Sequence, residues 1–435
     1  MSSVALFGVQ WGDEGKAKII DTIGQNPEYF FGNDYPLVVA RYMGGPNAGH
    51  TQYVDDKEVI FHGVPSGLTI TGAYNVDLPG FIADPKLMVE EIEHLRGLGF
   101  PVTPENLGIC GNVHMILEHH YWLEEKEIER SGGKIAPTRR AIFPTYVDTA
   151  SRRGMNFAEF SDKDTFSYLL EEALKRVSWE VGESTRNGDT ETRTRKPIDK
   201  AEYMEQYDAA REFLAPFIVS EGAVRAAHAD DNWIYEAQGG VMLDPVRGRR
   251  PDVTSSSALL LPANATRWGV SKALMSRVGA DSPPTRMGEE LEMKARGKKG
   301  TPGAEFGATS GRPRKVSWFD GPVVRYALRV GGVDKLALTK LDVLPKVGDE
   351  VFLCDYYLDG EKRLYEPPAD QTRWDRLKPH YIKVKGFPGV DISGARDWDD
   401  LPQEAKDYKK AVEDVVEFDI SLLSVGPRGD QSILL

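Results

Sequence analysis

The residues best suited to chemistry lie in one short segment near the N-terminus. Residues 8–16 read GVQWGDEGK; they follow the apolar residues 4–7 and precede a stretch that can begin a helix. A strand, a glycine-rich loop and a helix N-terminus in this order favour a bound phosphate, because unpaired backbone N–H groups and the helix dipole attract anions. Lys16 would reach a phosphate, and Asp13 would hold a metal ion or act as a base. The same pattern also occurs in simple tight turns.

The segment departs from a Walker loop at two positions. That motif requires glycine at position 10 and serine or threonine at position 17, where this chain has Gln10 and Ala17. Without a hydroxyl directly after Lys16, a metal ligand must come from elsewhere in the loop. An ordinary P-loop GTPase is therefore a poor interpretation of the chain.

Further loops along the chain combine glycine or proline with hydroxyl, basic or acidic residues. They read RYMGGPNAGHT (41–51), GVPSGL (63–68), TRRAIFPTY (138–146), SRRG (151–154), YEAQGG (235–240), PDVTSSSA (251–258), EFGATSGRPRK (305–315), LTKLD (338–342) and SVGPRGDQ (424–431). Arginine forks match phosphate and carboxylate oxygens, although paired loop arginines are commonly a solvated face. His50 stands among small residues, where a solvated loop residue and an acid–base group are equally good interpretations. The Asp342 carboxylate would suit the N1/N2 edge of guanine, which offers it two N–H donors.

Composition and charge limit the class of protein. The chain has 435 residues, of which 40% are hydrophobic and 28% charged, and its net charge is −13. We therefore expect a folded protein without a broad nucleic-acid-binding surface. Two cysteines, no run of 18 apolar residues and no signal pattern predict a cytoplasmic protein without a membrane partner. His114, His119 and His120 have no Cys, Asp or Glu spacing that would indicate a zinc site.

Hydrophobic patterns predict the elements that must position these loops. Strands are expected to begin near residues 4, 36, 107, 233, 336 and 420, and helices to span residues 85–96, 166–177 and 201–216. Strands that end in glycine-rich loops predict an α/β sheet with a ligand at the carboxyl ends of its strands. Residues 178–200 are polar and mixed in charge, which predicts a surface insertion. No repeat or linker divides the chain, so residues 1–435 are expected to form a single domain.

Taken in order, these segments resemble the adenylosuccinate synthetase family from one end of the chain to the other. The resemblance implies a single large α/β domain around a mostly parallel central sheet with P-loop-like glycine loops. It implies a ligase that joins L-aspartate to C6 of a 6-oxopurine nucleotide through a 6-phosphoryl intermediate. GTP would be the phosphoryl donor and Mg²⁺ the metal. The family is a homodimer in which an arginine of one subunit enters the other subunit's site.

The resemblance also implies a role for individual residues. The implied catalytic residues are Asp13, the base at purine N1; His50, the acid at the γ-phosphoryl group; and Gln238, which faces the purine 6-position. Mg²⁺ would be held by Asp13 and the Gly49 carbonyl. The implied GTP-binding residues are Gly12, Glu14, Gly15, Lys16, Gly49, His50, Thr51, Lys340, Asp342, Ser424 and Gly426. The acceptor nucleotide would contact Asp13, Asn47, Thr138, Arg152, Gln238, Thr254 and Arg312. L-Aspartate would contact Thr309, Ser310, Arg312 and Arg314.

Departures from the family's usual motifs bear on the identity of the acceptor. Pro46 and the SVGP segment resemble the archaeal enzyme and a set of viral relatives that act on (d)GMP instead of IMP. Gly240 would leave room for a 2-amino group. Asp13 is often altered in those viral relatives, and its presence here points back towards the parent enzyme.

We therefore expect (d)GMP as the acceptor, in the host cytoplasm if the protein is viral. The product would be N6-succino-2-amino-(deoxy)adenylate for 2,6-diaminopurine synthesis. An adenylosuccinate synthetase that uses IMP is the alternative. A regulator that binds nucleotides without turnover is a further one.

Overall fold

The chain forms two compact units. The computed structural model describes residues 2–54, 57–132, 138–182, 184–187, 190–194, 196–277, 283–301, 303–307 and 311–435. The first unit comprises Met1–Leu37, Ala48–Ile60 and Asn232–Leu435, and the second comprises Val38–Asn47 and Phe61–Asp231. Within these described ranges, no helix is both long and apolar enough to span a bilayer. The single-domain expectation for residues 1–435 stays a prediction.

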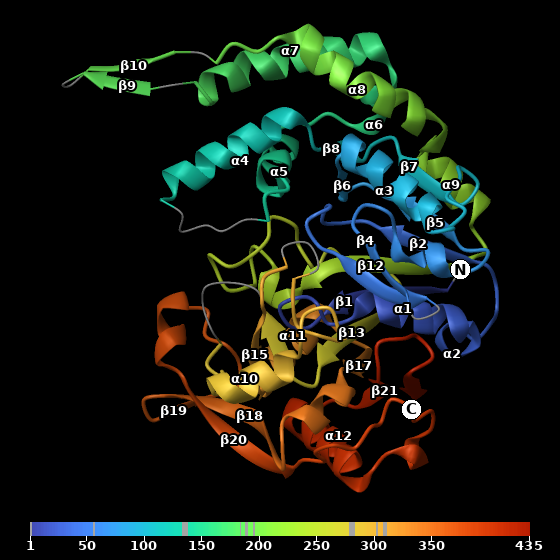
Figure 1. Ribbon diagram of the computed structural model, residues 1–435, viewed down its shortest axis with the longest axis vertical. Coiled ribbons are helices and arrows are strands. Elements are labelled where there is room, and N and C mark those ends of the chain that lie inside the picture. Colours follow the sequence, from blue (N-terminus) through green and yellow to red (C-terminus); the bar gives the residue numbers. More distant parts are fainter. Residues whose placement is uncertain are drawn as a thin grey trace. The chain divides into compact units, whose positions relative to one another are not determined.

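The first unit is built on six sheet strands, which confirms the expected α/β fold with a mostly parallel sheet (Figure 1). In spatial order the strands are β12 (Asn232–Gly240), β1 (Ser3–Gly8), β13 (Thr266–Lys272), β17 (Lys335–Thr339), β21 (Ile420–Ser424) and β22 (Ser432–Leu434). Neighbours are parallel except for the last pair. Residues 4–7 of β1 are fully buried, as a strand between two neighbours requires.

Helices and smaller sheets complete the first unit. The helices are α1 (Lys16–Gln25), α2 (Pro27–Phe31), α10 (Glu289–Arg296), α11 (Gly321–Gly331) and α12 (Gln403–Val416), with 3-10 turns η3 (Val241–Leu243), η4 (Leu341–Lys346), η5 (Gln371–Arg376) and η6 (Trp398–Asp400). The smaller sheets contain β3 (His50–Val54) with β4 (Lys57–Phe61), β14 (Met275–Arg277) with β15 (Lys315–Ser317), and β16 (Phe319–Asp320), β18 (Glu350–Asp359), β19 (Lys362–Leu364) and β20 (Lys378–Lys385).

The second unit carries four parallel strands and most of the remaining helices. The strand order is β11 (Ile218–Val219), β7 (Leu107–Cys110), β5 (Tyr74–Asp77) and β2 (Leu37–Arg41), and a short pair joins β6 (Ile82–Ala83) to β8 (His114–Met115). The helical elements are η1 (Ser66–Thr69), α3 (Pro85–Gly97), α4 (Glu118–Arg130), α5 (Ile142–Ala150), α6 (Phe157–Ser161), α7 (Lys163–Glu180), α8 (Lys200–Leu214), η2 (Ala215–Phe217) and α9 (Glu221–Ala227). The Asp84 side chain caps α3 by accepting the Lys86 N–H at 2.9 Å.

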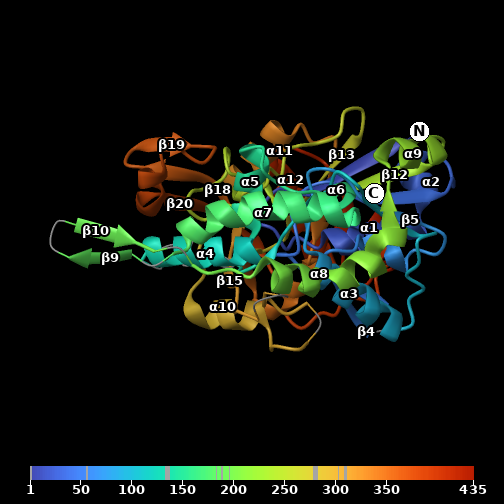
Figure 2. The same cartoon turned by 90° about the horizontal axis from the view of Figure 1, so that it is seen from above.

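The polar segment 178–200 contains regular structure. Helix α7 continues to Glu180, and two short strands, β9 (Ser184–Asn187) and β10 (Thr190–Arg193), then form an antiparallel hairpin before α8 begins. Figures 1 and 2 both show this hairpin extending away from the helices of its unit. The interpretation of residues 178–200 as a surface insertion stays a prediction, and the structure adds that the segment contains a hairpin.

Candidate active site

The glycine loop joins the end of β1 to the start of α1. Gly12 and Gly15 have φ angles of 82° and 87°, a left-handed conformation that glycine adopts without steric cost. Asp13 between them also has a positive φ, 58°, which aspartate tolerates better than most residues. The Asp13 side chain is exposed, while both residues beside it in the chain are buried. The loop thus presents one carboxylate at the carboxyl end of the sheet.

A buried carboxylate, that of Glu14, shapes this loop from inside. Its Oε1 accepts the N–H groups of Gly12 at 2.7 Å and Gln10 at 3.2 Å, and its Oε2 pairs with Lys16 Nζ at 2.7 Å. A side chain at Gly8 would overlap this carboxylate. Glu14 was expected to bind GTP. Because its side chain is turned inward, any such contact falls to its backbone N–H.

Gly240 at the end of β12 is required by the same packing. It is the register partner of Gly8, and a Cβ at position 240 would lie 2.5 Å from both the Gln10 carbonyl oxygen and Glu14 Oε1. This packing explains the glycine without a ligand, and the interpretation that Gly240 leaves room for a purine 2-amino group stays a prediction. The missing side chain makes room for the glycine loop.

Asp13 is paired with an arginine from the segment predicted to bind L-aspartate. Arg314 Nε lies 2.9 Å from Asp13 Oδ2, and Arg314 Nη1 lies 3.1 Å from Glu305 Oε2. Lys340, which was predicted to contact guanine, pairs with the other oxygen of Glu305. Burial opposes ionisation of Glu305, but Lys340, Lys272 and Arg314 together outweigh it and hold the pKa of Glu305 well below its usual range. Glu305 was not among the predicted site residues. It pairs with Arg314, predicted to bind L-aspartate, and with Lys340, predicted to bind GTP.

A buried lysine closes this network back onto the glycine loop. Lys272 Nζ donates to the Gly12 carbonyl at 3.2 Å and to Ser276 Oγ at 2.6 Å, and Ser276 Oγ donates to Glu305 Oε2 at 2.7 Å. Burial lowers the pKa of Lys272 to about 8. Glu14 therefore binds N–H groups of the loop, and Lys272 binds one of its carbonyl groups.

His50, the first residue of β3, is oriented by a carboxylate. Its Nδ1 pairs with Oε1 of Glu236 on β12, and both side chains are buried. A carboxylate at one ring nitrogen sets the ring orientation and decides which nitrogen carries a proton, as an acid–base histidine needs. Gln238 lies two residues beyond Glu236, in the part of β12 where its register with β1 shifts. Glu236 was not among the predicted site residues, although it stands within the YEAQGG segment.

Ser424, one of the residues predicted to bind guanine, contacts another buried lysine. Lys18 Nζ donates to Ser424 Oγ and, at 2.6 Å, to the Gln431 carbonyl, and Ser424 Oγ donates to the Gly426 carbonyl at 3.2 Å. Burial lowers the pKa of Lys18 to about 7, against the opposing effect of Asp342, which acts on it most strongly among the nearby carboxylates. The structure thus brings Ser424 and Gly426 together beside Lys18, which sequence reasoning did not select.

The remaining predicted residues come from several segments of the chain. Gly49 and Thr51 flank His50, and the Thr254 N–H donates to the Leu243 carbonyl at 2.8 Å. Arg312 is exposed. Thr309 and Ser310 lie outside the described residues, and Asn47, Thr138 and Arg152 belong to the second unit. The Asp13 carboxylate and the Gly49 carbonyl are oxygen donors of the kind Mg²⁺ prefers, so these residues fit the expected metal.

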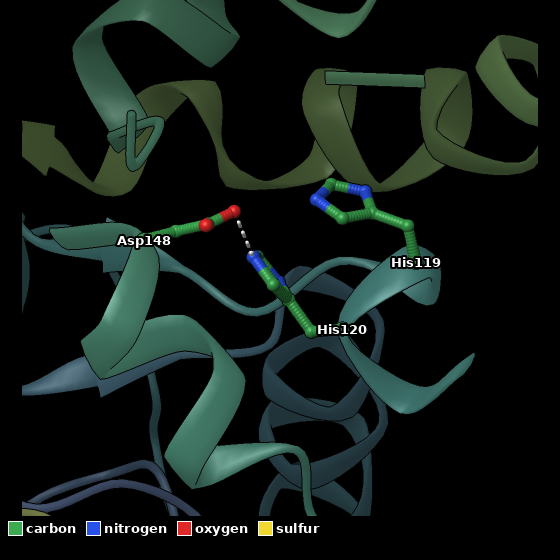
Figure 3. Close-up of side chains that lie close together, drawn as sticks. All are labelled: His119, His120 and Asp148. Carbon is green, nitrogen blue, oxygen red and sulfur yellow. Dashed lines mark hydrogen bonds and ion pairs between the residues drawn. The ribbon is translucent and has the colours of Figure 1, made fainter. Parts of the chain in front are cut away.

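The second unit contains a histidine–carboxylate cluster of its own (Figure 3). His119, His120 and Asp148 have ligand atoms within 4.8 Å of one another, and His120 Nε2 lies 3.3 Å from Asp148 Oδ2. The other ring nitrogen of His120 accepts the Leu117 N–H at 2.9 Å, and Arg176 pairs with Asp148 at 2.6 Å. With that nitrogen used and the carboxylate paired with Arg176, we interpret the cluster as a network of hydrogen bonds and one ion pair that joins α4, α5 and α7; burial lowers the pKa of His120, which favours its neutral form. Its acidic member was missed because Asp148 follows His120 by 28 residues.

Comparisons with known proteins agree over the whole length of the chain. A family model described as adenylosuccinate synthetase matches residues 5–433. The chain is 36% identical to the adenylosuccinate synthetase of Pelotomaculum thermopropionicum and 34% identical to that of Geotalea daltonii, each over 100% of this chain and 99% of the relative.

Two solved structures share the fold. Fully ligated adenylosuccinate synthetase from Plasmodium falciparum has a TM-score of 0.85 and 27% identity, and the match covers 99% of both chains. Succinoaminodeoxyadenylate synthetase of cyanophage S-2L, solved with dGMP and with dATP as an energy donor, has a TM-score of 0.58 and 15% identity, over 100% of this chain and 95% of that one. At that identity the second likeness speaks for the fold alone.

Proposed function

We propose that this chain, which belongs to the adenylosuccinate synthetase family, performs its aspartate–purine ligation at the site built around Asp13. Members of the family are carbon–nitrogen ligases that use GTP and Mg²⁺. The observation that carries the residue assignment is the glycine loop, where Glu14 and Lys272 hold the backbone so that the Asp13 carboxylate is exposed and paired with Arg314. A loop that only held a phosphate would not need a carboxylate in that position.

In the proposed reaction, the Asp13 carboxylate accepts the N1 proton of the acceptor purine. The electron pair released at N1 moves to O6, which attacks the γ-phosphorus of GTP, and GDP leaves. The L-aspartate amine then attacks C6, inorganic phosphate leaves with O6, and the amine loses a proton. Each step forms one bond and breaks another, so the net products are the succinyl-amino purine nucleotide, GDP and phosphate.

The other residues have distinct tasks in this scheme. His50, held by Glu236, would donate a proton or hydrogen bond to the γ-phosphoryl oxygens as charge develops there. Lys16 would exchange its contact with Glu14 for a phosphate oxygen. Arg314 would bind a carboxylate of L-aspartate through its fork. Mg²⁺, held by Asp13 and the Gly49 carbonyl, would neutralise negative charge on the phosphates.

For the acceptor we keep (d)GMP as the proposal, and two observations bear on it. Pro46 and the SVGP segment at residues 424–427 favour it, because they resemble the viral relatives as well as the archaeal enzyme. IMP is the second candidate. It is favoured by relatives of 34–36% identity that are adenylosuccinate synthetases and by the packing role of Gly240. We also propose a homodimer in which Arg152 reaches the partner's acceptor phosphate.

The test is a set of parallel reactions with GTP, Mg²⁺, L-aspartate and either IMP, GMP or dGMP. Phosphate release and the mass of the product would be measured in each. We expect a succinyl-amino nucleotide from GMP or dGMP, and phosphate release that requires both the acceptor and L-aspartate. Product from IMP alone would replace (d)GMP by IMP. GTP hydrolysis without L-aspartate, or no turnover with any acceptor, would reject the ligase assignment for this chain.

A further inference from the structure

Two lysines of helix α1 contact two different segments, the glycine loop and residues 424–431. Lys16 at its first position pairs with Glu14 in the glycine loop. Lys18 is two positions later, and residues with this spacing point to different sides of a helix. The Lys18 side chain is directed to residues 424–431 instead, where its Nζ meets Ser424 Oγ and the Gln431 carbonyl. One helix therefore connects the residues proposed for the donor's phosphates with those proposed for its base.

The donor and acceptor of each hydrogen bond around Lys18 can be assigned. A lysine side chain donates, so Ser424 Oγ accepts from Lys18 and turns its own proton to another acceptor. At present that acceptor is the Gly426 carbonyl, at 3.2 Å. Lys18, Ser424 and Gln431 are all buried, so exchange of these bonds for water is restricted. The Ser424 hydroxyl proton is therefore directed away from Lys18, to the Gly426 carbonyl here or to another acceptor in its place.

We propose that Lys18 is a positioning residue that selects the base of the donor nucleotide. By donating to Ser424, it directs the Ser424 hydroxyl proton to a 6-oxo group of the donor purine. A 6-amino group cannot accept that proton, because its nitrogen carries only N–H donors in the plane of the ring. Asp342 would read the opposite, 2-amino side of guanine. This inference rests on the proposed function, in which GTP is the donor and residues 424–426 face its base.

The arrangement of the loop supports a directing role. Gln431, whose carbonyl takes the second Lys18 bond, packs against Gly426, and its Oε1 accepts the Arg428 N–H at 3.0 Å. The Val425 N–H donates to the Gln431 carbonyl at 3.0 Å. Lys18 therefore bonds both to Ser424 itself and to the Gln431 carbonyl, which also accepts the N–H of the residue after Ser424.

The experiment measures binding of three nucleoside triphosphates by displacement of a fluorescent GDP analogue from the intact protein. GTP has both the 6-oxo and the 2-amino group, ITP has only the 6-oxo group, and 2-aminopurine riboside triphosphate has only the 2-amino group. In Lys18→Met, we expect the Kd of GTP and of ITP to rise about 10-fold, as the loss of a buried hydrogen bond to a polar partner would give. The Kd of the 2-aminopurine nucleotide should stay unchanged.

Two further variants keep the result interpretable. Asp21→Ala removes another contact from α1 to the same loop, because Asp21 Oδ2 accepts the Gly429 N–H at 3.1 Å. This variant should change the Kd of all three nucleotides by the same factor, or change none of them. In a Ser424→Ala background, Lys18→Met should have no additional effect on GTP. Equal weakening of all three nucleotides by Lys18→Met, or an unchanged GTP Kd, would overturn the inference. A wild-type protein that fails to bind GTP would instead reject the proposed donor, and the inference with it.

Discussion

Arg314 Nε lies 2.9 Å from Asp13 Oδ2, which pairs the arginine proposed to bind L-aspartate with the carboxylate proposed to act as base. In this ion pair, the Arg314 guanidinium binds the carboxylate that is proposed to accept a proton, and Asp13 binds the guanidinium that is proposed to hold L-aspartate. The carboxylate of an incoming L-aspartate offers Arg314 a replacement partner, which would leave Asp13 available to the purine and the metal. We therefore expect the substrate's own carboxylate to take over this ion pair when the complex forms.

The first prediction concerns Asp13→Ala. We expect turnover to be abolished, because the substitution removes the proposed base at N1 and a proposed metal ligand together, while guanine nucleotide still binds through other residues. Steady-state assays and displacement of a fluorescent GDP analogue would measure the two effects separately. Ordinary turnover in this variant would mean that another group removes the N1 proton. An Asp34→Ala substitution, at an exposed loop position of the same unit, should keep full activity.

The second prediction concerns Glu14→Gln. The amide keeps one acceptor oxygen for the loop N–H groups but no longer balances the charge of Lys16, and both side chains are buried. Breaking a buried ion pair in this way should lower the free energy of unfolding by about 3 kcal/mol. Urea unfolding would measure it, with Glu93→Gln on α3 as the exposed control. An unfolding free energy equal to that of the control would contradict the shaping role of Glu14.

Guanine recognition is tested by Asp342→Asn. The carboxylate is proposed to accept the N1 and N2 protons of guanine, whereas an amide can donate to the 2-oxo group of xanthine. We expect kcat/KM for GTP to fall at least about 10-fold and that for XTP to rise. ITP, which lacks the 2-amino group, should lose less than GTP. If GTP and XTP respond alike, the base is read by other residues.

A pH dependence of stability follows from Lys18. Its pKa is about 7 in the folded chain, below the ordinary value of 10.5, because of burial. Between these two values the unfolded chain holds a proton that the folded chain has released, so folding stability rises with pH in this window. The contribution is at most about 1.4 kcal/mol per pH unit for one proton.

Wild type and Lys18→Met should therefore differ in slope between pH 7.5 and pH 9.5, with urea unfolding as the measurement. Lys272, whose pKa is about 8, contributes the same sign to both proteins and cancels in the comparison. Parallel curves for the two proteins would show that Lys18 keeps its proton in the folded state.

Contiguous segments of the chain were enough to predict the central features of this protein. The glycine loop, Asp13 and Lys16 stand within nine residues, and their order with respect to a strand and a helix indicates their chemistry. The α/β class, the helix capped by Asp84 and the family resemblance also depend on local patterns, which are present in the sequence itself.

The partners of these residues were decided only by the tertiary structure. Glu305 beside Lys340, Glu236 beside His50 and Ser424 beside Lys18 are separated along the chain by 35, 186 and 406 residues. Such contacts depend on which strands are neighbours and in what register, and no local pattern specifies that. The same reason explains Gly240, whose missing side chain was assigned to a ligand by sequence but is explained by the neighbouring β1 strand and its loop. Residue types and their order determined the chemistry available to this chain, and strand order and register determined which groups hold it in place.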